Sequence, residues 1–305
     1  MVDIGSNDGT LLNCFKIHNI NTLGVEPSQA GKIANKNGIE TIIDYFNLNT
    51  VKKILKKPKK PKIVTATNVF AHIENPNFLI SLIKKIMSKN TVFITESHYL
   101  LSLIKTLQYD TIYHEHLRYY HLNSLIKLFS LNDLEVFHAK KIPTHGGSIR
   151  VYASKKGSFE KTKNLKQILE QEKKSGMNKM MIYETFKKRV VDSKYKLLKL
   201  LIELKQKKKT IFAIGAPSRA STLINYTGID RDLIEYILEV KGSNKINKYL
   251  PGTLIPVVDE KLIKNNPPDY LLILSWHIKD DLIKIFRKKG FKGRFIIPLP
   301  KPKIF

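Results

Sequence analysis

Residues 2–12, VDIGSNDGTLL, decide the fold class of this chain. The residues VDI predict a short strand, GSNDG predicts a tight turn, and the apolar spacing from Thr10 to Ile17 predicts a helix. Glycine lets the chain turn sharply at the end of a strand and lets a ligand approach the backbone. The stretch therefore indicates the first strand–turn–helix unit of a parallel α/β sheet.

The same alternation of strands and helices continues along the chain. The further strands of this first sheet are expected at 22–25, 41–43, 63–66, 91–95, 133–139 and 148–154. The strands of a second, smaller sheet are expected at 210–214, 234–238, 254–257, 270–274 and 294–297. We therefore expect two Rossmann-like α/β domains, at 1–157 and 209–305, joined by a lysine-rich helical connector at 158–208.

The charge balance restricts the class of partner. The chain has 305 residues, with 53 Lys and Arg against 26 Asp and Glu, and a formal net charge of +27. Such a charge is typical of proteins that bind nucleic acids. However, only seven of the basic residues are arginines, the side chain that specific phosphate and base recognition favours. We expect no specific nucleic-acid binding and favour anionic small molecules.

Hydropathy and cysteine content indicate the compartment. No apolar run approaches the roughly 18 residues of a membrane span, and no basic start followed by an apolar stretch marks a signal peptide. Cys14 is the single cysteine, so the sequence predicts neither an intrachain disulfide nor a cysteine-rich zinc site. We expect a cytoplasmic protein with no membrane segment and no zinc, and the sequence leaves the oligomeric state open.

A cofactor site is predicted at the first turn. Glu26 ends the next expected strand, where a carboxylate can accept hydrogen bonds from ribose hydroxyls. Asp3, Asp8 and Glu26 crowd acid around this turn, which disfavours phosphate and favours S-adenosylmethionine with its cationic sulfonium. The alternative for the glycine turn is an ordinary βα turn. The alternative for His72 is a histidine at a helix start whose ring is hydrogen-bonded to the backbone. The residues expected to bind the cofactor are Asp3, Gly5, Ser6, Asn7, Gly9, Glu26, Pro27, Asn68 and His72.

Residues 113–116, Tyr-His-Glu-His, form the densest cluster of proton-active groups. Histidine titrates near neutrality and a nearby carboxylate can orient it, so we interpret the cluster as a general base with its supporting groups. Zinc is a weaker interpretation because only two imidazoles are local and no third ligand is evident. A hydrogen-bonded aromatic plug is the structural alternative. The candidate catalytic residues are His116, Glu115, Tyr113 and His114.

Three further motifs are candidates for substrate binding. Paired glycines in 144–150, THGGSIR, suggest backbone packed close to a ligand or to a neighbouring loop. The small residues of 215–222, GAPSRAST, predict a helix N-terminus that fits a diphosphate, although close packing on the strand also explains them. The candidate substrate-binding residues are His145, Gly146, Gly147, Gly215, Ala216, Pro217, Arg219, Lys248, Tyr249 and Trp276; plain packing is the alternative for Tyr249 and Trp276.

Together these motifs resemble those of one family. The matching segments are 2–12, 24–28 (GVEPS), 67–73 (TNVFAHI), 112–122 (IYHEHLRYYHL), 145–152 (HGGSIRVY), 215–226 (GAPSRASTLINY), 248–253 (KYLPGT) and 268–282 (PDYLLILSWHIKDDL). They occur in family order and cover almost the whole chain, and YHEH together with HGGS is specific. The chain resembles the S-adenosylmethionine-dependent sugar-nucleotide C-methyltransferases, which methylate carbon 3 of a nucleoside-diphosphate 4-keto-deoxysugar.

The resemblance implies a fold, a cofactor and a base. It implies a class I methyltransferase domain followed by a second Rossmann-like domain, with the sugar nucleotide between them. His116 would be the general base, and Tyr113 and Glu115 would line the same pocket. Family members usually carry an N-terminal zinc-binding domain before the glycine turn. Because this sequence begins inside the first strand, we expect that domain to be absent.

Three functions stay open at this point. The first is C-methylation of a sugar nucleotide, and the second is methylation of oxygen or nitrogen on another anionic acceptor. The third is a binding-only chain that has lost activity together with the zinc-binding domain. A general base, His116, suits a carbon acid and favours the first function. The sequence does not define the nucleotide, the sugar or the stereochemistry.

Overall fold

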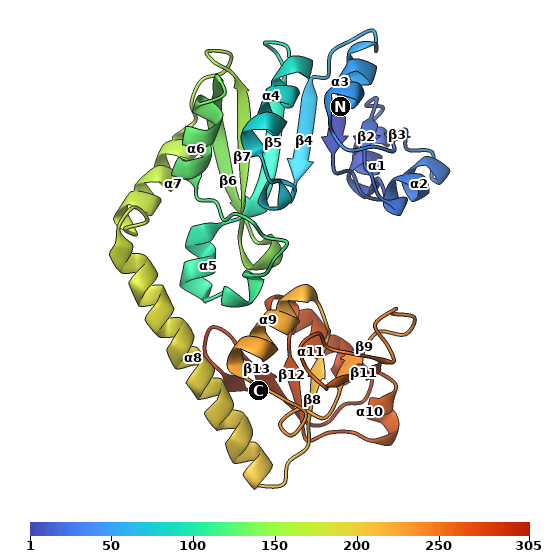
Figure 1. The fold of residues 1–305 in the computed structure, drawn as a ribbon, viewed down its shortest axis with the longest axis vertical. Helices are drawn as coiled ribbons and strands as arrows, with labels where there is room; N and C mark the ends of the chain where they lie inside the picture. Colours follow the sequence, from blue (N-terminus) through green and yellow to red (C-terminus); the bar gives the residue numbers. More distant parts are fainter. The chain divides into compact units, whose positions relative to one another are not determined.

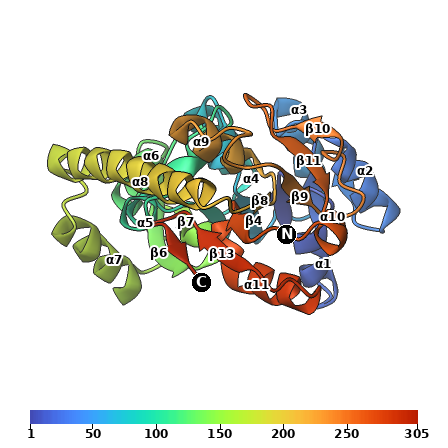
Figure 2. The same cartoon turned by 90° about the horizontal axis from the view of Figure 1, so that it is seen from below.

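The computed structural model describes residues 1–305 as two compact units. The N-terminal unit contains Met1–Ser102 and Glu115–Asn178, and the C-terminal unit contains Leu103–His114 and Lys179–Phe305. A short segment from the first half of the chain therefore belongs to the second unit. Figure 1 follows the chain from blue to red, and Figure 2 gives a second view of the same elements.

The N-terminal unit is built on a seven-stranded sheet in the order β3-β2-β1-β4-β5-β7-β6. Its first five strands run parallel, and β7 pairs antiparallel with both β5 and β6. The strands are β1 (Val2–Ile4), β2 (Leu23–Val25), β3 (Thr41–Ile42), β4 (Ile63–Thr67), β5 (Val92–His98), β6 (Leu134–Ile142) and β7 (Ser148–Lys155). The helices are α1 (Thr10–Lys16), α2 (Gln29–Lys36), α3 (Leu48–Leu55), α4 (Pro76–Ile86), α6 (Leu122–Ser130) and α7 (Lys163–Lys174). A further helix, α5 (Leu100–Thr106), leads into the segment that joins the second unit.

The C-terminal unit has a second seven-stranded sheet, in the order β10-β11-β9-β8-β12-β13-β14. Its middle strands are parallel, and the two edge strands, β10 and β14, are antiparallel. The strands are β8 (Ile211–Ile214), β9 (Ile237–Glu239), β10 (Lys248–Tyr249), β11 (Pro256–Asp259), β12 (Tyr270–Ile273), β13 (Arg294–Ile297) and β14 (Lys303–Ile304). The helices are α8 (Met180–Gln206), α9 (Ser218–Thr227), α10 (Leu262–Asn265) and α11 (Lys279–Lys288). The expected α/β fold class with a second α/β domain is confirmed.

The two helices of the expected 158–208 connector belong to different units. α7 packs on α6 and β6 in the N-terminal unit, whereas α8 packs on α9 in the C-terminal unit. In α8 the buried side chains include Leu197, Leu201 and Leu204, whose spacing marks one helix face. Each helix buries its apolar face within its own unit. The boundary between the units therefore lies between Asn178 and Lys179 instead of at 157 and 209.

The centres of both sheets are apolar and closely packed. In the N-terminal unit the rings of Phe70, Phe93 and Phe129 contact one another, with centroids 5.7–6.0 Å apart. In the C-terminal unit Phe212 and Leu271 are fully buried on neighbouring strands. Close packing of this kind leaves little freedom to the strands. The loops that follow the strands are therefore held on rigid supports, which is what a functional site requires.

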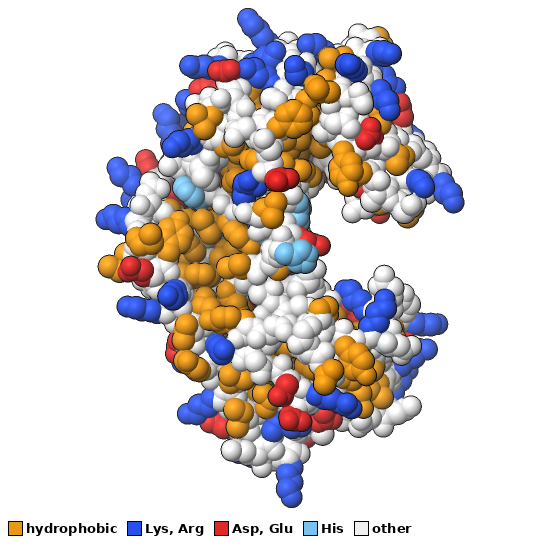
Figure 3. All heavy atoms as spheres, in the orientation of Figure 1, with side chains coloured by type: hydrophobic (Ala, Val, Ile, Leu, Met, Phe, Trp, Pro, Cys, Tyr) orange, Lys and Arg blue, Asp and Glu red, His pale blue; other side chains and the backbone are white.

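The surface, the helix lengths and the arrangement of possible metal ligands add three observations. On the face drawn in Figure 3, Lys and Arg side chains lie singly and in small groups over both units. No helix combines the length and the apolar character needed to cross a membrane. No group of three or more His, Cys, Asp and Glu side chains is arranged to hold a metal ion.

Candidate active site

The turn after β1 places a glutamate beside the backbone of the GSNDG loop. Gly5 adopts φ +71°, and its N–H donates to Val25 O at 2.9 Å, which ties the turn to β2. Glu26 follows β2 and accepts hydrogen bonds from Asn7 N at 3.1 Å and Ser28 N at 2.9 Å. The carboxylate is thereby held at the carboxyl end of the strand, with further lone pairs available to a ligand.

Asp3 is a buried acid directly beneath this turn. Its side chain is 2% exposed, and the Thr65 hydroxyl donates a hydrogen bond to it. Burial raises the pKa of Asp3 to about 6; the Thr65 bond opposes the rise, and the charge of Glu26 adds to it. One of the three acids expected around the turn therefore lies inside the sheet.

The other residues expected to bind the cofactor divide into two groups. Asn7, Gly9, Pro27 and Asn68 belong to the turns after β1, β2 and β4, and Asn68 takes the left-handed conformation with φ +58°. Ser6 differs, because its hydroxyl is buried against β2: a Cβ added to Gly24 would lie 2.4 Å from Ser6 Oγ. Only the backbone of Ser6 is therefore available at the turn.

His116 lies in a group of imidazole rings within the N-terminal unit. Its ring centroid is 5.1 Å from that of His72 and 5.0 Å from that of His98. His72 follows β4 and donates from Nδ1 to Glu115 O at 2.8 Å, and His98 is the last residue of β5. The carboxyl ends of parallel strands meet at one edge of a sheet. The base candidate and the cofactor turn after β1 are therefore on the same edge.

The HGGS turn is fixed next to this group. His145 has φ +54°, and its ring lies 5.4 Å from that of His98. Buried Glu96 accepts from Thr144 Oγ1 at 3.1 Å and from Arg150 Nε and Nη2 at 3.0 and 2.9 Å. A Cβ on Gly147 would lie 2.6 Å from Ser102, so close backbone packing explains this glycine. Of the motif, His145 is the side chain that faces the imidazoles.

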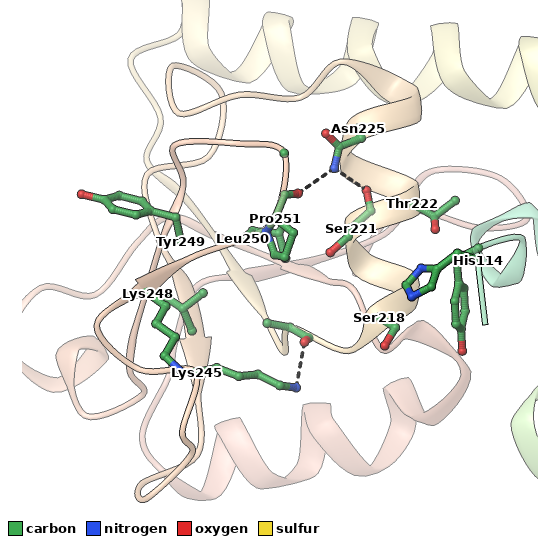
Figure 4. Close-up of a pocket in the computed structure, with 14 residues that line it drawn as sticks. His114, Ser218, Ser221, Thr222, Asn225, Lys245, Lys248, Tyr249, Leu250 and Pro251 are labelled. Carbon is green, nitrogen blue, oxygen red and sulfur yellow. Dashed lines mark hydrogen bonds between the residues drawn. The ribbon is translucent and has the colours of Figure 1, made fainter.

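The C-terminal unit contains a pocket of about 670 Å³ along one side of α9 (Figure 4). Of the candidate residues, Tyr113, His114, Ala216, Lys248 and Tyr249 line it. The sequence analysis missed Ser218, Ser221, Thr222, Asn225 and Lys245, which also line it. Four of these, at 218, 221, 222 and 225, have the spacing of one helix face, and that polar pattern is the signal that could have revealed them.

The turn after β8 repeats the arrangement of the first turn. Gly215 has φ +81° and donates to Leu238 O at 2.9 Å. Glu239, at the end of β9, accepts from Ala216 N at 2.7 Å. Lys245 Nζ donates to Ala216 O at 2.8 Å and lies 3.8 Å from the Glu239 carboxylate. Glu239 was not among the candidate residues, although its position at a strand end matches that of Glu26.

Arg219 and Trp276, both candidate substrate contacts, do not line this pocket. Arg219 is 7% exposed, and its Nε and Nη2 donate to Asp110 at 2.7 and 2.9 Å. Trp276 Nε1 donates to the same carboxylate at 2.8 Å. The planar fork of the Arg219 guanidinium is therefore already occupied, and its charge is paired with the buried Asp110 carboxylate.

Comparison with known proteins identifies the chain's relatives. Residues 1–139 match the family model described as a methyltransferase domain, and residues 143–300 match the C-methyltransferase C-terminal domain. The C-methyltransferase NovU of Streptomyces niveus is 30% identical over 100% of this chain and 73% of its own length. The chain belongs to the C-methyltransferase family.

Solved structures also resemble about half of the chain. A possible histamine N-methyltransferase of Thermotoga maritima is 17% identical, with a TM-score of 0.39, over 51% of this chain and 81% of its own. The plantazolicin methyltransferase BamL, solved with S-adenosylhomocysteine (SAH), is 12% identical, with a TM-score of 0.41, over 50% of this chain and 76% of its own. From its family, the chain is an S-adenosylmethionine-dependent C-methyltransferase with a class I fold followed by a second α/β domain.

The first turn of this C-methyltransferase fits its cofactor. The Glu26 carboxylate is held by two backbone N–H groups, so its orientation does not depend on a ligand. Glu26 and Asp8 are acids, and neither forms an ion pair with lysine or arginine, so a sulfonium meets net negative charge here. Gly5, Asn7, Glu26 and Asn68 are the residues that would hold the cofactor.

Proposed function

We propose that this C-methyltransferase transfers a methyl group to carbon 3 of a nucleoside-diphosphate 4-keto-deoxysugar. The proposal rests on the segment Tyr113–His116. Tyr113 and His114 line the pocket of the C-terminal unit, and His116 lies among imidazoles at the strand edge that carries the cofactor turn. One continuous segment thus connects a pocket suited to the acceptor with a base suited to its chemistry.

The pocket in the C-terminal unit supports a nucleotide acceptor. Lys245 and Lys248 supply positive charge, and Ser218 begins α9, whose first backbone N–H groups are open to an anion. Ser221, Thr222 and Asn225 add hydroxyl and amide groups along the same side of the helix (Figure 4). A diphosphate at the helix start with a nucleoside along the helix uses all of these groups.

The reaction needs a base because carbon is a poor nucleophile. A ketone at carbon 4 acidifies the hydrogen on carbon 3, and His116 accepts that proton to leave an enolate. S-adenosylmethionine supplies an electrophilic methyl group on its sulfonium. With S-adenosylmethionine held at Asn7 and Glu26, the enolate carbon would form its new bond to this methyl as the carbon–sulfur bond breaks. Tyr113 and His114 are candidate donors to the developing enolate oxygen, where hydrogen bonds stabilise the transition state most.

The supporting groups act before the chemical step. His72 is held by Glu115 O, and this contact orients both the ring and the backbone next to His116. Glu115 contributes its carbonyl there, and its exposed carboxylate can orient an imidazole. Holding two bound substrates in the reactive geometry supplies a large part of the rate. We assign this reaction to the cytoplasm.

The test replaces the proposed base. A positioned base contributes about 10²–10⁴-fold, so His116→Ala should lose activity on 4-keto-deoxysugar nucleotides by that factor while S-adenosylmethionine affinity stays nearly unchanged. With SAH in place of the methyl donor, wild type should exchange the carbon-3 hydrogen with deuterated water, and the variant should not. His18→Ala, at an exposed histidine, is the matched control.

Two outcomes would contradict the proposal. Methylation and exchange at wild-type rates in a folded His116→Ala protein would remove this residue from the mechanism and leave His114 as the next candidate. Methylation of oxygen or nitrogen without any carbon-3 exchange would indicate an acceptor with a ready nucleophile. Mass spectrometry of the product and NMR of the exchanged sugar distinguish these results.

A further inference from the structure

Asp110 is a fully buried carboxylate that the proposed chemistry does not use. It lies in the short 3₁₀ turn Tyr109–Thr111 and is 0% exposed. Its two oxygens accept three hydrogen bonds: from Arg219 Nε at 2.7 Å, from Arg219 Nη2 at 2.9 Å and from Trp276 Nε1 at 2.8 Å. Arg219 Nη1 also donates to His277 Nδ1 at 3.0 Å. An acid, a base and an indole N–H therefore satisfy one another inside the C-terminal unit.

The segment that carries Asp110 is attached to the same unit at other points. Arg189 on α8 donates to Ile104 O and Lys105 O, both at 3.0 Å. Leu107 and Tyr109 belong to the unit's apolar core, and the ring of Tyr109 lies 5.2 Å from that of Tyr226. The segment from 103 to 114 thus has its backbone, its apolar side chains and its acid bound to α8, α9 and the loop after β12.

The Asp110–Arg219 pair contributes more to the orientation of this segment than to the stability of the fold. A buried ion pair repays only part of its desolvation cost, and well-packed apolar residues often stabilise a fold as much. What the bidentate pair adds is a fixed orientation, because the guanidinium fork meets the carboxylate in one plane. The residues just after Asp110 are Tyr113 and His114, which line the acceptor pocket, and then Glu115 and His116.

We propose that Asp110, Arg219 and Trp276 form a positioning network for the segment Tyr113–His116. The network fixes the start of that segment to α9, the same helix that lines the acceptor pocket. None of the three residues touches the reacting atoms. The inference rests on the proposed function, since it takes His116 as the base.

The test compares one conservative change in two backgrounds. Arg219→Lys keeps the charge but loses the planar fork, and we expect it to lower kcat by about 10- to 100-fold in the wild-type background, because a small misplacement of a reacting group costs about that much. In the His116→Ala background the same change should alter the residual rate less than threefold. Trp276→Phe, which removes one donor, should show the same pattern with a smaller effect. Arg231→Lys, at an exposed arginine, is the matched control.

Two measurements separate positioning from simple stabilisation. If Arg219→Lys lowers the rate equally in both backgrounds, the network acts through global stability and the proposal is wrong. Hydrogen exchange gives a readout that needs no activity: residues 111–116 should exchange faster in Arg219→Lys, with residues 5–9 unchanged. Unchanged exchange at 111–116 overturns the positioning role even if the acceptor proves to be another molecule, whereas faster exchange there without sugar methylation counts against the proposed function alone.

Discussion

The glycine turn after β1 and the glycine turn after β8 are built alike but differ in charge. Each follows the strand of its sheet that comes first in sequence, each glycine has positive φ, and each turn meets a glutamate at the end of the next strand. At the first turn Asp3 is buried two residues before Gly5, whereas Ala213 occupies the matching place before Gly215. Lys245 contacts the second turn, and no lysine contact is found at Glu26.

This difference teaches how one backbone design can select opposite ligands. A strand–turn–helix unit offers glycine access and backbone N–H groups in both units. Acid around the first turn suits the sulfonium of the methyl donor, and lysine beside the second suits a diphosphate. The backbone thus provides the place, and the few side chains around the turn decide the sign of charge that is accepted there.

The largest effect is expected from neutralising Asp3. Burial raises the pKa of Asp3 from 3.8 to about 6. A shift of about two units means that ionised Asp3 lowers the free energy of unfolding of the ligand-free protein by about 3 kcal/mol. Below about pH 4 both states are protonated and the penalty is absent; it grows as the pH rises to about 6 and then stays constant. Asp3→Asn should therefore stabilise the ligand-free protein at pH 7 but not at pH 4.

Thermal or urea unfolding at a series of pH values measures this effect. The stability difference between Asp3→Asn and wild type should widen between about pH 4 and pH 6 and remain level above it. Ala213→Asn, at the matching position of the other turn, is the comparison. It should only destabilise the protein, since it does not replace a buried acid. A difference that does not depend on pH would show that Asp3 ionises normally and that the two turns differ less than we infer.

A reciprocal pair of substitutions tests the assignment of ligands to turns. Glu26→Ala should weaken S-adenosylmethionine binding by roughly 1–3 kcal/mol because charge-assisted bonds to the ribose are lost, with no change for thymidine diphosphate. Glu239→Ala should weaken binding of thymidine diphosphate or the sugar nucleotide by up to about 2 kcal/mol, because the Ala216 N–H loses the acceptor that fixes the turn, with no change for the methyl donor. Calorimetry on both proteins with both ligands gives the four values, and a crossed pattern would reverse the assignment.

The smallest effect is expected from Lys245. Its side chain is 47% exposed, and exposed charges contribute little in water. Lys245→Ala should weaken thymidine diphosphate binding by roughly 0.5–1 kcal/mol at low salt and less at high salt, because ions screen an exposed charge. Lys241→Ala, at an exposed lysine nearby in sequence, is the control. An effect that does not change with salt would indicate that Lys245 acts through its bond to Ala216 O.

The sequence predicts well what neighbouring residues decide together. The strand–turn–helix at 2–17 and the strands at 270–274 and 294–297 depend on local patterns, and the structure has elements at these places. Each glycine turn was recognised for the same reason. The connector at 158–208 shows the limit: its helical pattern is local, but which sheet each helix covers depends on residues far along the chain.

Arg219 shows the same limit at the site. An arginine at the start of a helix predicts an anion site by local rules, but Asp110, 109 positions away, takes its guanidinium. Asp110 itself gave no signal, because a lone aspartate between Tyr109 and Thr111 resembles any surface acid until its partners are known. Glu239 could have been found by comparison with Glu26, since both end the strand that follows a glycine turn.

Residues 103–114 belong to the C-terminal unit although most of the first half of the chain belongs to the other. This also bears on the order in which the parts of the chain form during synthesis. Trp276, which bonds Asp110, is 166 positions downstream, and Arg219 is 109 positions downstream. Closing loops of this length costs entropy and makes such contacts slow to form. The sheet of the N-terminal unit is formed by residues up to Lys155, whereas Asp110, just before Tyr113 and His114, has both of its partners only after Trp276 has been synthesised. With the sites assigned as we propose, the turn for the methyl donor can therefore form earlier than the support of the base-bearing segment.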